Sequence, residues 1–470
     1  MASELHFKSA FELSAMIRRR ELKPSELMAA TIARIESVNP KLNAFVALRS
    51  DAAMAEARAL DDKIARKEEV GSLAGLPFGV KDLEDAAGLP TTFGSVPFKN
   101  NVPKEDSIEV ARLKAAGAIV IGKTNAPEFG YTGFTRNLLF GVTRNPWNLD
   151  RTPGGSSGGS SAAIAGGLVP LATGSDGGGS IRIPACYTGC FGLKPSFGRI
   201  PGNPMLGMLG WDDTAVLGPL TRTVRDAAMF MDAAVGYHPI DKDSLPHPGI
   251  SYQAVLDRLP KKLRIAFHPD FNHVVQREVS REVEKAVAAF RDMGHEITIL
   301  DDKLPQTGNA WMRVGASQSL AMLSDYVEPH RGEFGRAFIS GTESANRLTW
   351  RHYGVAYRER LAFSEWIRGV FERFDLLMSP TLPSEAFGAS GPPPSEIDGK
   401  PLKDILDAVV FTYPINMSGH PAASVRAGFT DSGLPCGLQI VAERHRDDLV
   451  LQAAYAYEQA RPWNDRWPKI

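Results

Sequence analysis

Cysteine is scarce in this sequence, which holds three among 470 residues: Cys186, Cys190 and Cys436. Three are too few for a disulfide framework, and the first two lack the second pair or nearby histidines of a zinc site. We expect buried free thiols in a reducing compartment. Clustered His, Asp and Glu residues are also missing, so we expect no metal and no cofactor.

An excess of charge and a long apolar run are absent as well. The 53 basic and 54 acidic residues leave a net charge of −1, which gives no support to a nucleic-acid or membrane-surface role. No run approaches the ~20 apolar residues of a transmembrane helix. Acidic and basic residues are mixed before Arg18–Arg20, unlike a secretory signal. We expect a cytoplasmic protein with a small-molecule partner, no nucleic acid and no membrane; a homodimer stays open.

The remaining sequence alternates between amphipathic helical patterns and β-branched runs. At 470 residues it is long enough for one large α/β domain or two domains. Helices are expected at residues 9–20, 25–38 (with Ser25 as N-cap), 52–66, 107–116, 223–234, 275–290 and 447–460. Strands are expected at 76–81, 118–121, 191–194, 263–267, 297–300, 376–379, 422–425 and 437–441. This order predicts one layered sheet with an irregular, mostly helical insertion at 301–400.

Two Gly/Ser clusters, at residues 154–161 and 174–180, enclose the apolar run 162–172. Gly/Ser-rich segments are typical of flexible linkers, but a solvated linker has no use for an apolar run. The pattern instead predicts a loop, a short helix, a strand, and a second loop that opens a second helix. Both loops would present serines and backbone N–H groups to one place.

Residues 117–124 satisfy the phosphate-binding pattern G-x-x-x-x-G-K-[ST]. That motif requires a strand before the first glycine and a helix after the lysine. Here a helix is expected before Gly117, and the intervening A-I-V-I is itself strand-like. We therefore do not expect a nucleotide site.

Glycine loops that display serines suggest nucleophilic catalysis. A Ser-His-Asp triad would usually use G-x-S-x-G, which does not occur; His420 is the one histidine in a loop-like motif. A serine activated by lysine is the other option, and Lys81 is the best candidate because it ends an apolar strand. Burial would lower the pKa of this lysine toward the ~7–8 at which it can act as a base. Pairing of Lys81 with Asp82 at a strand end is the structural alternative.

Together, these segments resemble the amidase signature family of serine hydrolases. The matching motifs, in the family's order, are G-V-K-D (79–82), K-T-N (123–125) with P-E-F (127–129), T-R-N-P-W (143–147), G-G-S-S-G-G (154–159), G-G-S-I-R (178–182) with P-A (184–185), G-L-K-P (192–195), and G-L-P (433–435) with G-L-Q-I (437–440). The resemblance implies a single domain over residues 1–470, with a catalytic core at 70–200. It also implies a central mixed, twisted β-sheet covered by helices on both faces.

The resemblance assigns roles to individual residues. It implies a Ser–cis-Ser–Lys triad, with Ser180 as the nucleophile, Ser156 as the bridging serine 24 residues earlier, and Lys81 as the base. The backbone N–H groups of Gly177, Gly178, Gly179 and Ser180 match the oxyanion hole. Asp176 and Arg182 flank the nucleophile, and we expect them to brace the loop as an ion pair. The implied reaction hydrolyses a carboxylic amide to an acid and ammonia or an amine through an acyl-enzyme.

Substrate choice should come from the loops around the pocket. Tyr131, Phe134, Trp311, Phe411 and Tyr413 are candidate pocket residues that would favour apolar or aromatic amides. Departures from the family pattern at Arg136, Leu138, Leu139 and Arg426 leave substrate inference open. The alternative function is the glutaminase (A) subunit of a glutamine-dependent tRNA amidotransferase, and a catalytically inactive binding protein is a third possibility.

Overall fold

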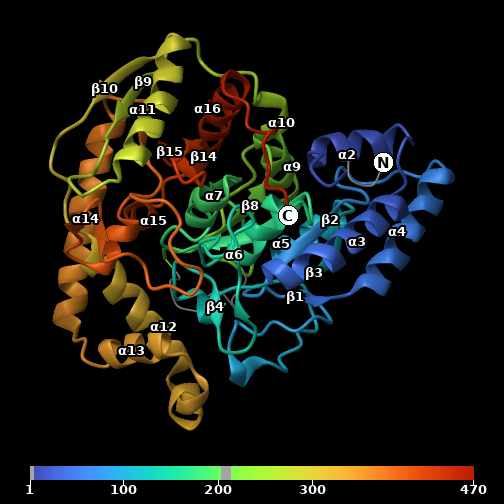
Figure 1. The fold of residues 1–470 in the computed structure, drawn as a ribbon, viewed down its shortest axis with the longest axis horizontal. Coiled ribbons are helices and arrows are strands. Elements are labelled where there is room, and N and C mark those ends of the chain that lie inside the picture. Colours follow the sequence, from blue (N-terminus) through green and yellow to red (C-terminus); the bar gives the residue numbers. More distant parts are fainter. Residues whose placement is uncertain (1–4, 203–212) are drawn as a thin grey trace.

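The computed structural model describes residues 5–202 and 213–470. Its centre is an eleven-stranded sheet (Figure 1). In spatial order the strands are β1 (Phe45–Leu48), β3 (Ile119–Thr124), β2 (Pro77–Lys81), β6 (Leu171–Asp176), β8 (Val216–Thr221), β7 (Phe191–Lys194), β14 (Ala422–Phe429), β15 (Pro435–Ala442), β11 (Leu376–Pro380), β9 (Arg264–Phe267) and β10 (Glu296–Ile299). Strands from both ends of the chain share this sheet, so the protein is a single domain.

The sheet is mixed. Strand β2 lies between β3 and β6 and is parallel to both, whereas β6, β8, β7, β14, β15 and β11 follow one another in antiparallel pairs. Strands β11, β9 and β10 are again parallel. Because parallel strands end at the same edge, the C-terminal residues of β2 and β6 lie close together. Those residues are Lys81 and Asp176.

Helices cover both faces of the sheet, as expected. One face packs against α2 (Ala10–Arg18), α5 (Ile108–Ala115), α9 (Val224–Ala234), α11 (Arg277–Asp292) and α16 (Asp447–Ala460). The other packs against α3 (Pro24–Leu42), α4 (Ser50–Ala65), α6 (Gly158–Ala165), α14 (Trp350–Phe371) and α15 (Tyr413–Ser418). Alternation along β11 shows both contacts: Leu376 and Met378 join the first core, and Leu377 joins the other. No described helix combines the length and apolar character that crossing a membrane requires.

Local capping explains where several helices begin. Ser9, Ser107 and Thr223 accept hydrogen bonds from backbone N–H groups in the first turns of α2, α5 and α9. The expected N-cap at Ser25 is wrong. Helix α3 begins one residue earlier at Pro24, whose fixed φ suits a first helical position, and Lys23 is its N-cap.

The described elements that have no counterpart in the sequence predictions include strands β1 and β8 and helices α10 (Tyr252–Val255) and α15. Lys123 and Thr124, expected in a loop, extend β3. Gly117 and Gly294, which follow α5 and α11, both have positive φ angles, as is common just after a helix. Gly117 lies in the turn between α5 and β3, so the chain has no phosphate-binding loop there.

The region from 301 to 400 is mostly helical. It contains α12 (Gly308–His330) and α13 (Arg336–Ala345), at the lower left of Figure 1, and α14, above them at the left edge. Strand β11 at Leu376–Pro380, predicted at 376–379, also falls within this range and belongs to the central sheet. A short hairpin of β12 (Glu396–Ile397) and β13 (Lys400–Pro401) follows, and helix α7 (Arg182–Thr188) and the hairpin β4–β5 (Arg136–Asn137 and Gly141–Val142) complete the surroundings of the site.

Candidate active site

The two Gly/Ser loops meet beside the end of β2. One loop precedes α6 and the other joins β6 to α7. Their backbones are tied together, since the Ser157 N–H donates to the Ser180 carbonyl at 3.1 Å. The Ser157 hydroxyl and the Ser175 backbone add contacts of 3.3 Å. The sequence pattern therefore serves to bring two serine-bearing loops to one place.

Lys81 is fully buried beneath these loops. Its Nζ lies 2.8 Å from Ser156 Oγ, 2.8 Å from Ser175 Oγ and 3.3 Å from the Ser175 carbonyl oxygen. Burial lowers the pKa of Lys81 to about 7, although the charges of Glu84 and Asp176 partly oppose that shift. The predicted alternative, pairing with Asp82, does not occur: the nearest amine to Asp82 is that of Lys123, at 3.7 Å.

Ser156 follows a cis peptide bond with Gly155. A Cβ on Gly155 would lie 2.8 Å from the backbone of Phe134 and Thr132, so only glycine fits this close approach. Ser156 is 3% exposed, and Ser180 is half-buried at the mouth of the loop. Both serines border the same cavity.

Asp176 and Arg182 form a fully buried ion pair across the base of the second loop. Arg182 Nη2 lies 2.9 Å from Asp176 Oδ1 and Nε lies 3.0 Å from Oδ2. Burial raises the pKa of Asp176, but the Arg182 guanidinium outweighs it and holds the pKa well below its ordinary value. Asn416 and Gln439 complete the contacts of the pair. Breaking such a pair typically costs roughly 3–5 kcal/mol, so it holds the loop rigidly.

The loop from 177 to 180 exposes three of the four N–H groups predicted as the oxyanion hole. The hydrogen bonds among the described residues do not use the N–H groups of Gly177, Gly178 or Ser180. The prediction is wrong for Gly179. This residue has a φ of +127°, and its N–H points inward and donates to Asp176 Oδ1 at 2.7 Å. The Gly179 N–H is therefore not available to a ligand.

The carbonyl groups of this loop are fixed from outside. Trp311 Nε1 donates to the Gly177 oxygen at 2.8 Å, and the Thr412 hydroxyl donates to the Gly178 oxygen at 2.7 Å. Since a trans peptide directs C=O and N–H to opposite sides, the Trp311 bond turns the Gly178 N–H away from Trp311's Nε1. Helix α12 and the segment before α15 thus orient a loop more than 100 residues earlier.

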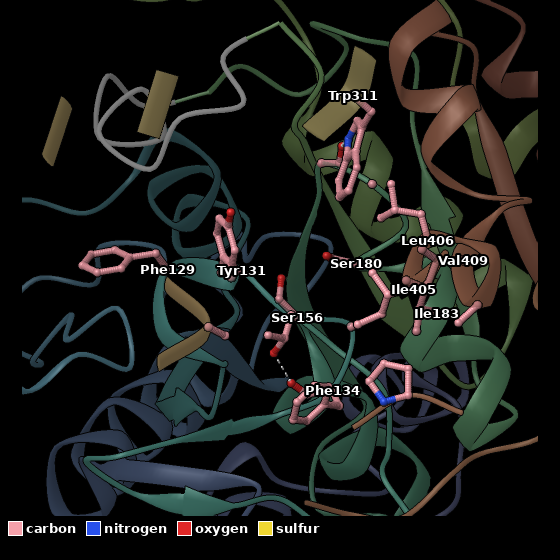
Figure 2. A pocket seen from close by; sticks show the side chains of 18 of the residues that line it. Phe129, Tyr131, Phe134, Ser156, Ser180, Ile183, Trp311, Ile405, Leu406 and Val409 are labelled. Atoms are coloured by element: carbon pink, nitrogen blue, oxygen red, sulfur yellow. Dashed lines mark hydrogen bonds between the residues drawn. The ribbon is translucent and has the colours of Figure 1, made fainter. Parts of the chain in front are cut away.

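The loops open into a cavity of about 260 Å³. In Figure 2, Phe129 and Tyr131 lie on one side of Ser156 and Ser180, and Ile183, Ile405, Leu406 and Val409 lie on the other, with Trp311 above. Phe134, Phe387, Tyr187 and Met312 also border the space. Among the described residues that line it, none carries a charged side chain. The cavity therefore suits an uncharged, largely apolar molecule.

Three of the five predicted pocket residues, Tyr131, Phe134 and Trp311, line this cavity. Phe411 and Tyr413 do not, and these two predictions are wrong. Phe411 is fully buried in the core between the sheet and α14. Tyr413 stacks on Trp311 with ring centres 5.5 Å apart, so it supports the indole from behind.

Several residues singled out from the sequence lie elsewhere. Arg136 is exposed and donates to the Ser390 carbonyl, and Leu138 is also exposed, so neither borders the cavity. Arg426 is buried near the C-terminus, where it donates to the carbonyl groups of Gly189, Trp463 and Arg466. His420 stacks on Phe371 and faces Glu443, away from both serines.

Sequence reasoning missed part of the cavity wall. Phe129 lies in the recognised P-E-F motif, whose place beside the serine loops was a usable signal. Ile405, Leu406 and Val409 lie in the segment just before 411–415, and no local pattern distinguishes them from core residues. The three cysteines are buried and unpaired, and no group of three or more His, Cys, Asp or Glu side chains among the described residues could hold a metal.

Two serines, a buried amine that is readily deprotonated, and free backbone N–H groups before an uncharged cavity define a serine-hydrolase type of site. The sequence profile of the Amidase family matches residues 26–451. The chain belongs to this family and is an amidase with the amidase signature fold.

Individual relatives match this chain over nearly the whole length of both proteins. An acylamidase of Rhodococcus erythropolis is 40% identical over 475 residues, covering 99% of this chain and 98% of the relative. The A-type subunit of a glutamyl-tRNA(Gln) amidotransferase from Moorella thermoacetica is 36% identical over 497 residues, covering 99% of both. The solved structure of a bacterial aryl acylamidase of the amidase signature family superposes with a TM-score of 0.92 at 34% identity, covering 98% of both chains.

Proposed function

We propose that this amidase acts alone on uncharged amides with apolar or aromatic groups. The observation that carries the proposal is the cavity at Ser156 and Ser180, whose described lining is aromatic and aliphatic and has no charged side chain. An apolar acyl or amine group gains free energy on leaving water for such walls, at roughly 25 cal/mol per Å² of buried apolar surface. The similarity to an acylamidase and to an aryl acylamidase supports the same substrate class.

In the proposed mechanism, neutral Lys81 accepts a proton from Ser156, and Ser156 accepts one from Ser180. The Ser180 oxygen attacks the amide carbonyl, and the N–H groups of Gly178, Gly177 and Ser180 stabilise the negative charge that develops on the carbonyl oxygen. The relay then returns the proton to the leaving amine. Water hydrolyses the acyl-enzyme by the same route and releases the acid.

The tRNA amidotransferase relatives make a glutaminase the second candidate. Glutamine brings an α-ammonium and an α-carboxylate into the site, and each needs a partner when it is desolvated. The described lining of the cavity offers neither a carboxylate nor a cationic side chain. This absence favours the uncharged amide.

A substrate panel tests the choice. We expect hydrolysis of anilides and medium-chain primary amides by the purified chain with no other protein present, measured by released amine or ammonia. Glutamine should be turned over at least 100-fold less efficiently in kcat/KM, because burying its unpaired charges costs several kcal/mol. Activity on glutamine alone would overturn the proposed substrate class and favour the amidotransferase role.

The pKa of Lys81 predicts the pH dependence. Because burial lowers that pKa to about 7, the neutral, active amine predominates above pH 7 and is lost as the pH falls below it. We expect kcat/KM for a neutral amide to decline tenfold per pH unit on the acid side, with a midpoint near pH 7. A pH–rate profile on a substrate without titratable groups measures this limb, and a midpoint below pH 5 would contradict a lysine base.

The cysteines bear on the compartment in which the enzyme works. Three buried, unpaired thiols support a reducing compartment, and we propose the cytoplasm. A small-molecule amide is the one partner that the site itself supports. A homodimer and the absence of a nucleic-acid or membrane partner stay predictions.

A further inference from the structure

Two glutamates form a buried carboxyl pair behind Lys81. Glu84 follows β2 in a turn closed by its N–H and the Lys81 carbonyl, at 2.9 Å, and Glu109 lies in the first turn of α5. Their exposed fractions are 3% and 0%. The proposed proton relay uses neither residue, and no motif of the sequence analysis includes them.

The pair can exist only if it holds a proton. Both carboxyl oxygens of Glu109 and Oε2 of Glu84 are buried with no hydrogen-bond donor among the described residues. Two ionised carboxylates cannot remain in contact in a dry site, so one must be protonated. Burial raises the pKa of both carboxyl groups, and the charge of Glu84 raises that of Glu109 further, well above its ordinary value. Glu109 is therefore the acid that donates, and Glu84 accepts.

One oxygen of the Glu84 carboxyl group has a hydrogen-bond donor among the described residues. Its Oε1 accepts a hydrogen bond of 3.0 Å from the Thr173 hydroxyl, and the same hydroxyl accepts the backbone N–H of Lys81 at 3.0 Å. The amine of Lys123 donates to the backbone carbonyl oxygen of Glu84, not to its carboxylate. Thr173 thus joins the carboxylate to the strand residue that carries the proposed base.

The other carboxylates near Lys81 and Lys123 have ion-pair or hydrogen-bond partners of their own. Asp176 faces Lys81 but is engaged by both nitrogens of the Arg182 fork. The charges of Asp82 and Asp85 act on Lys123, and Asp82 also accepts two hydrogen bonds from Thr92. Glu84 faces both lysines.

We propose that protonated Glu109 keeps Glu84 ionised, and that the Glu84 charge makes both glutamates positioning residues that set the protonation of Lys81. The inference rests on the proposed role of Lys81 as the base. Burial alone drives the amine toward a weakly basic state, and a carboxylate nearby returns part of its basicity. The pair keeps Lys81 basic enough to accept a proton from Ser156, yet neutral at physiological pH.

The test compares pH–rate profiles of kcat/KM on a neutral anilide. Glu84→Gln removes the charge, so the acid limb should move to lower pH by about one unit, because one nearby charge shifts a buried group by that order. The plateau should also fall, because Lys81 becomes a weaker base. Glu109→Gln keeps a donor to Glu84, and its limb should match that of the wild type.

Glu109→Leu removes the donor that keeps Glu84 ionised, so its acid limb should shift as in Glu84→Gln. Two variants with the same expected shift keep the proposal testable if one of them folds poorly. Glu458→Gln is the matched control, since Glu458 is a buried carboxyl group on α16 whose partner is the Val224 N–H. Its limb should not move. Labelling of Ser180 by a fluorophosphonate, followed against pH, gives the same comparison for variants with slow turnover.

The outcomes separate this inference from the proposed function. A wild-type acid limb near pH 7 that stays in place in both Glu84→Gln and Glu109→Leu overturns the role of the pair and leaves the amidase mechanism standing. An equal shift in Glu109→Gln and Glu84→Gln also overturns it, because the donor would then not suffice. A wild type that lacks the limb overturns the proposed role of Lys81 itself, and one that is not labelled at Ser180 overturns the proposed nucleophile.

Discussion

Replacement of Ser180 by alanine is expected to lower kcat/KM for every amide by about 10⁴-fold or more, the range found when a nucleophile is removed from a serine-hydrolase site. The alanine methyl group fills the space of the serine side chain without its oxygen, so acyl-enzyme formation stops. The Asp176–Arg182 pair and the contacts of Trp311 and Thr412 do not involve the Ser180 hydroxyl. The loop should therefore keep its shape, and KM or inhibitor affinity should change little.

Fluorophosphonate labelling located by mass spectrometry gives the direct readout. The wild type should carry the label on Ser180, and Ser180→Ala should carry none. Ser424→Ala is a matched control, because Ser424 is a buried serine on β14 whose hydroxyl contacts Thr381 at 2.9 Å, away from the cavity. Label on another serine in the wild type, or full turnover by Ser180→Ala, would refute the assignment of the nucleophile.

The parts of the fold that were predictable have local causes. Helices with a capping serine or threonine, such as those after Ser107 and Thr223, begin where the sequence indicates. The apolar run before Lys81 forms strand β2, as its pattern predicts, and every residue of that strand is buried. Strand β8 escaped prediction because a glycine and a proline interrupt its apolar pattern, although both lie within a buried sheet.

The site was predictable where one segment of chain determines it. The motifs indicated Lys81, Ser156 and Ser180, and the structure brings the first two into contact and both serines to one cavity. Gly179 shows the limit: three consecutive glycines do not reveal which N–H turns inward. That depends on the Asp176 carboxylate and on Thr412, whose hydroxyl would lie 2.3 Å from a Cβ at 179.

The cavity wall was the least predictable part because distant segments build it. Trp311 and Tyr413 are both aromatic residues near helix ends, and the sequence alone gave them equal standing. Packing decides between them: Trp311 borders the cavity and reaches Gly177, while Tyr413 lies behind it. Ile405, Leu406 and Val409 likewise acquire their role only when their segment folds over α7.

Replacement of Lys81 by methionine is the second change with a large expected effect. Methionine matches the length of the lysine stem but cannot accept a proton, so kcat/KM should fall by about 10⁴-fold. The acid limb near pH 7 should disappear from the residual activity, since the group that titrates there is gone. A residual rate that still declines below pH 7 would assign the limb to another group.

Stability provides the complementary readout, because a buried amine is costly. The pKa of Lys81 falls from an ordinary 10.5 to about 7 in the folded protein, so between those values the unfolded chain binds a proton that the folded chain releases. This term destabilises the wild type below pH 10.5, increasingly so down to pH 7. Replacing Lys81 removes this cost and so raises the stability, but the lost hydrogen bonds to Ser156 and Ser175 offset part of that increase.

Lys81→Met should therefore have a Tm equal to or above that of the wild type at pH 7, with the difference shrinking as the pH approaches 10. A catalytically dead variant that is no less stable identifies a residue held in place for chemistry rather than for folding, since a structural lysine would lower the Tm when removed. A marked fall in Tm at pH 7 would mean that the amine is charged and paired in the folded protein, and a charged Lys81 cannot take the proton of Ser156.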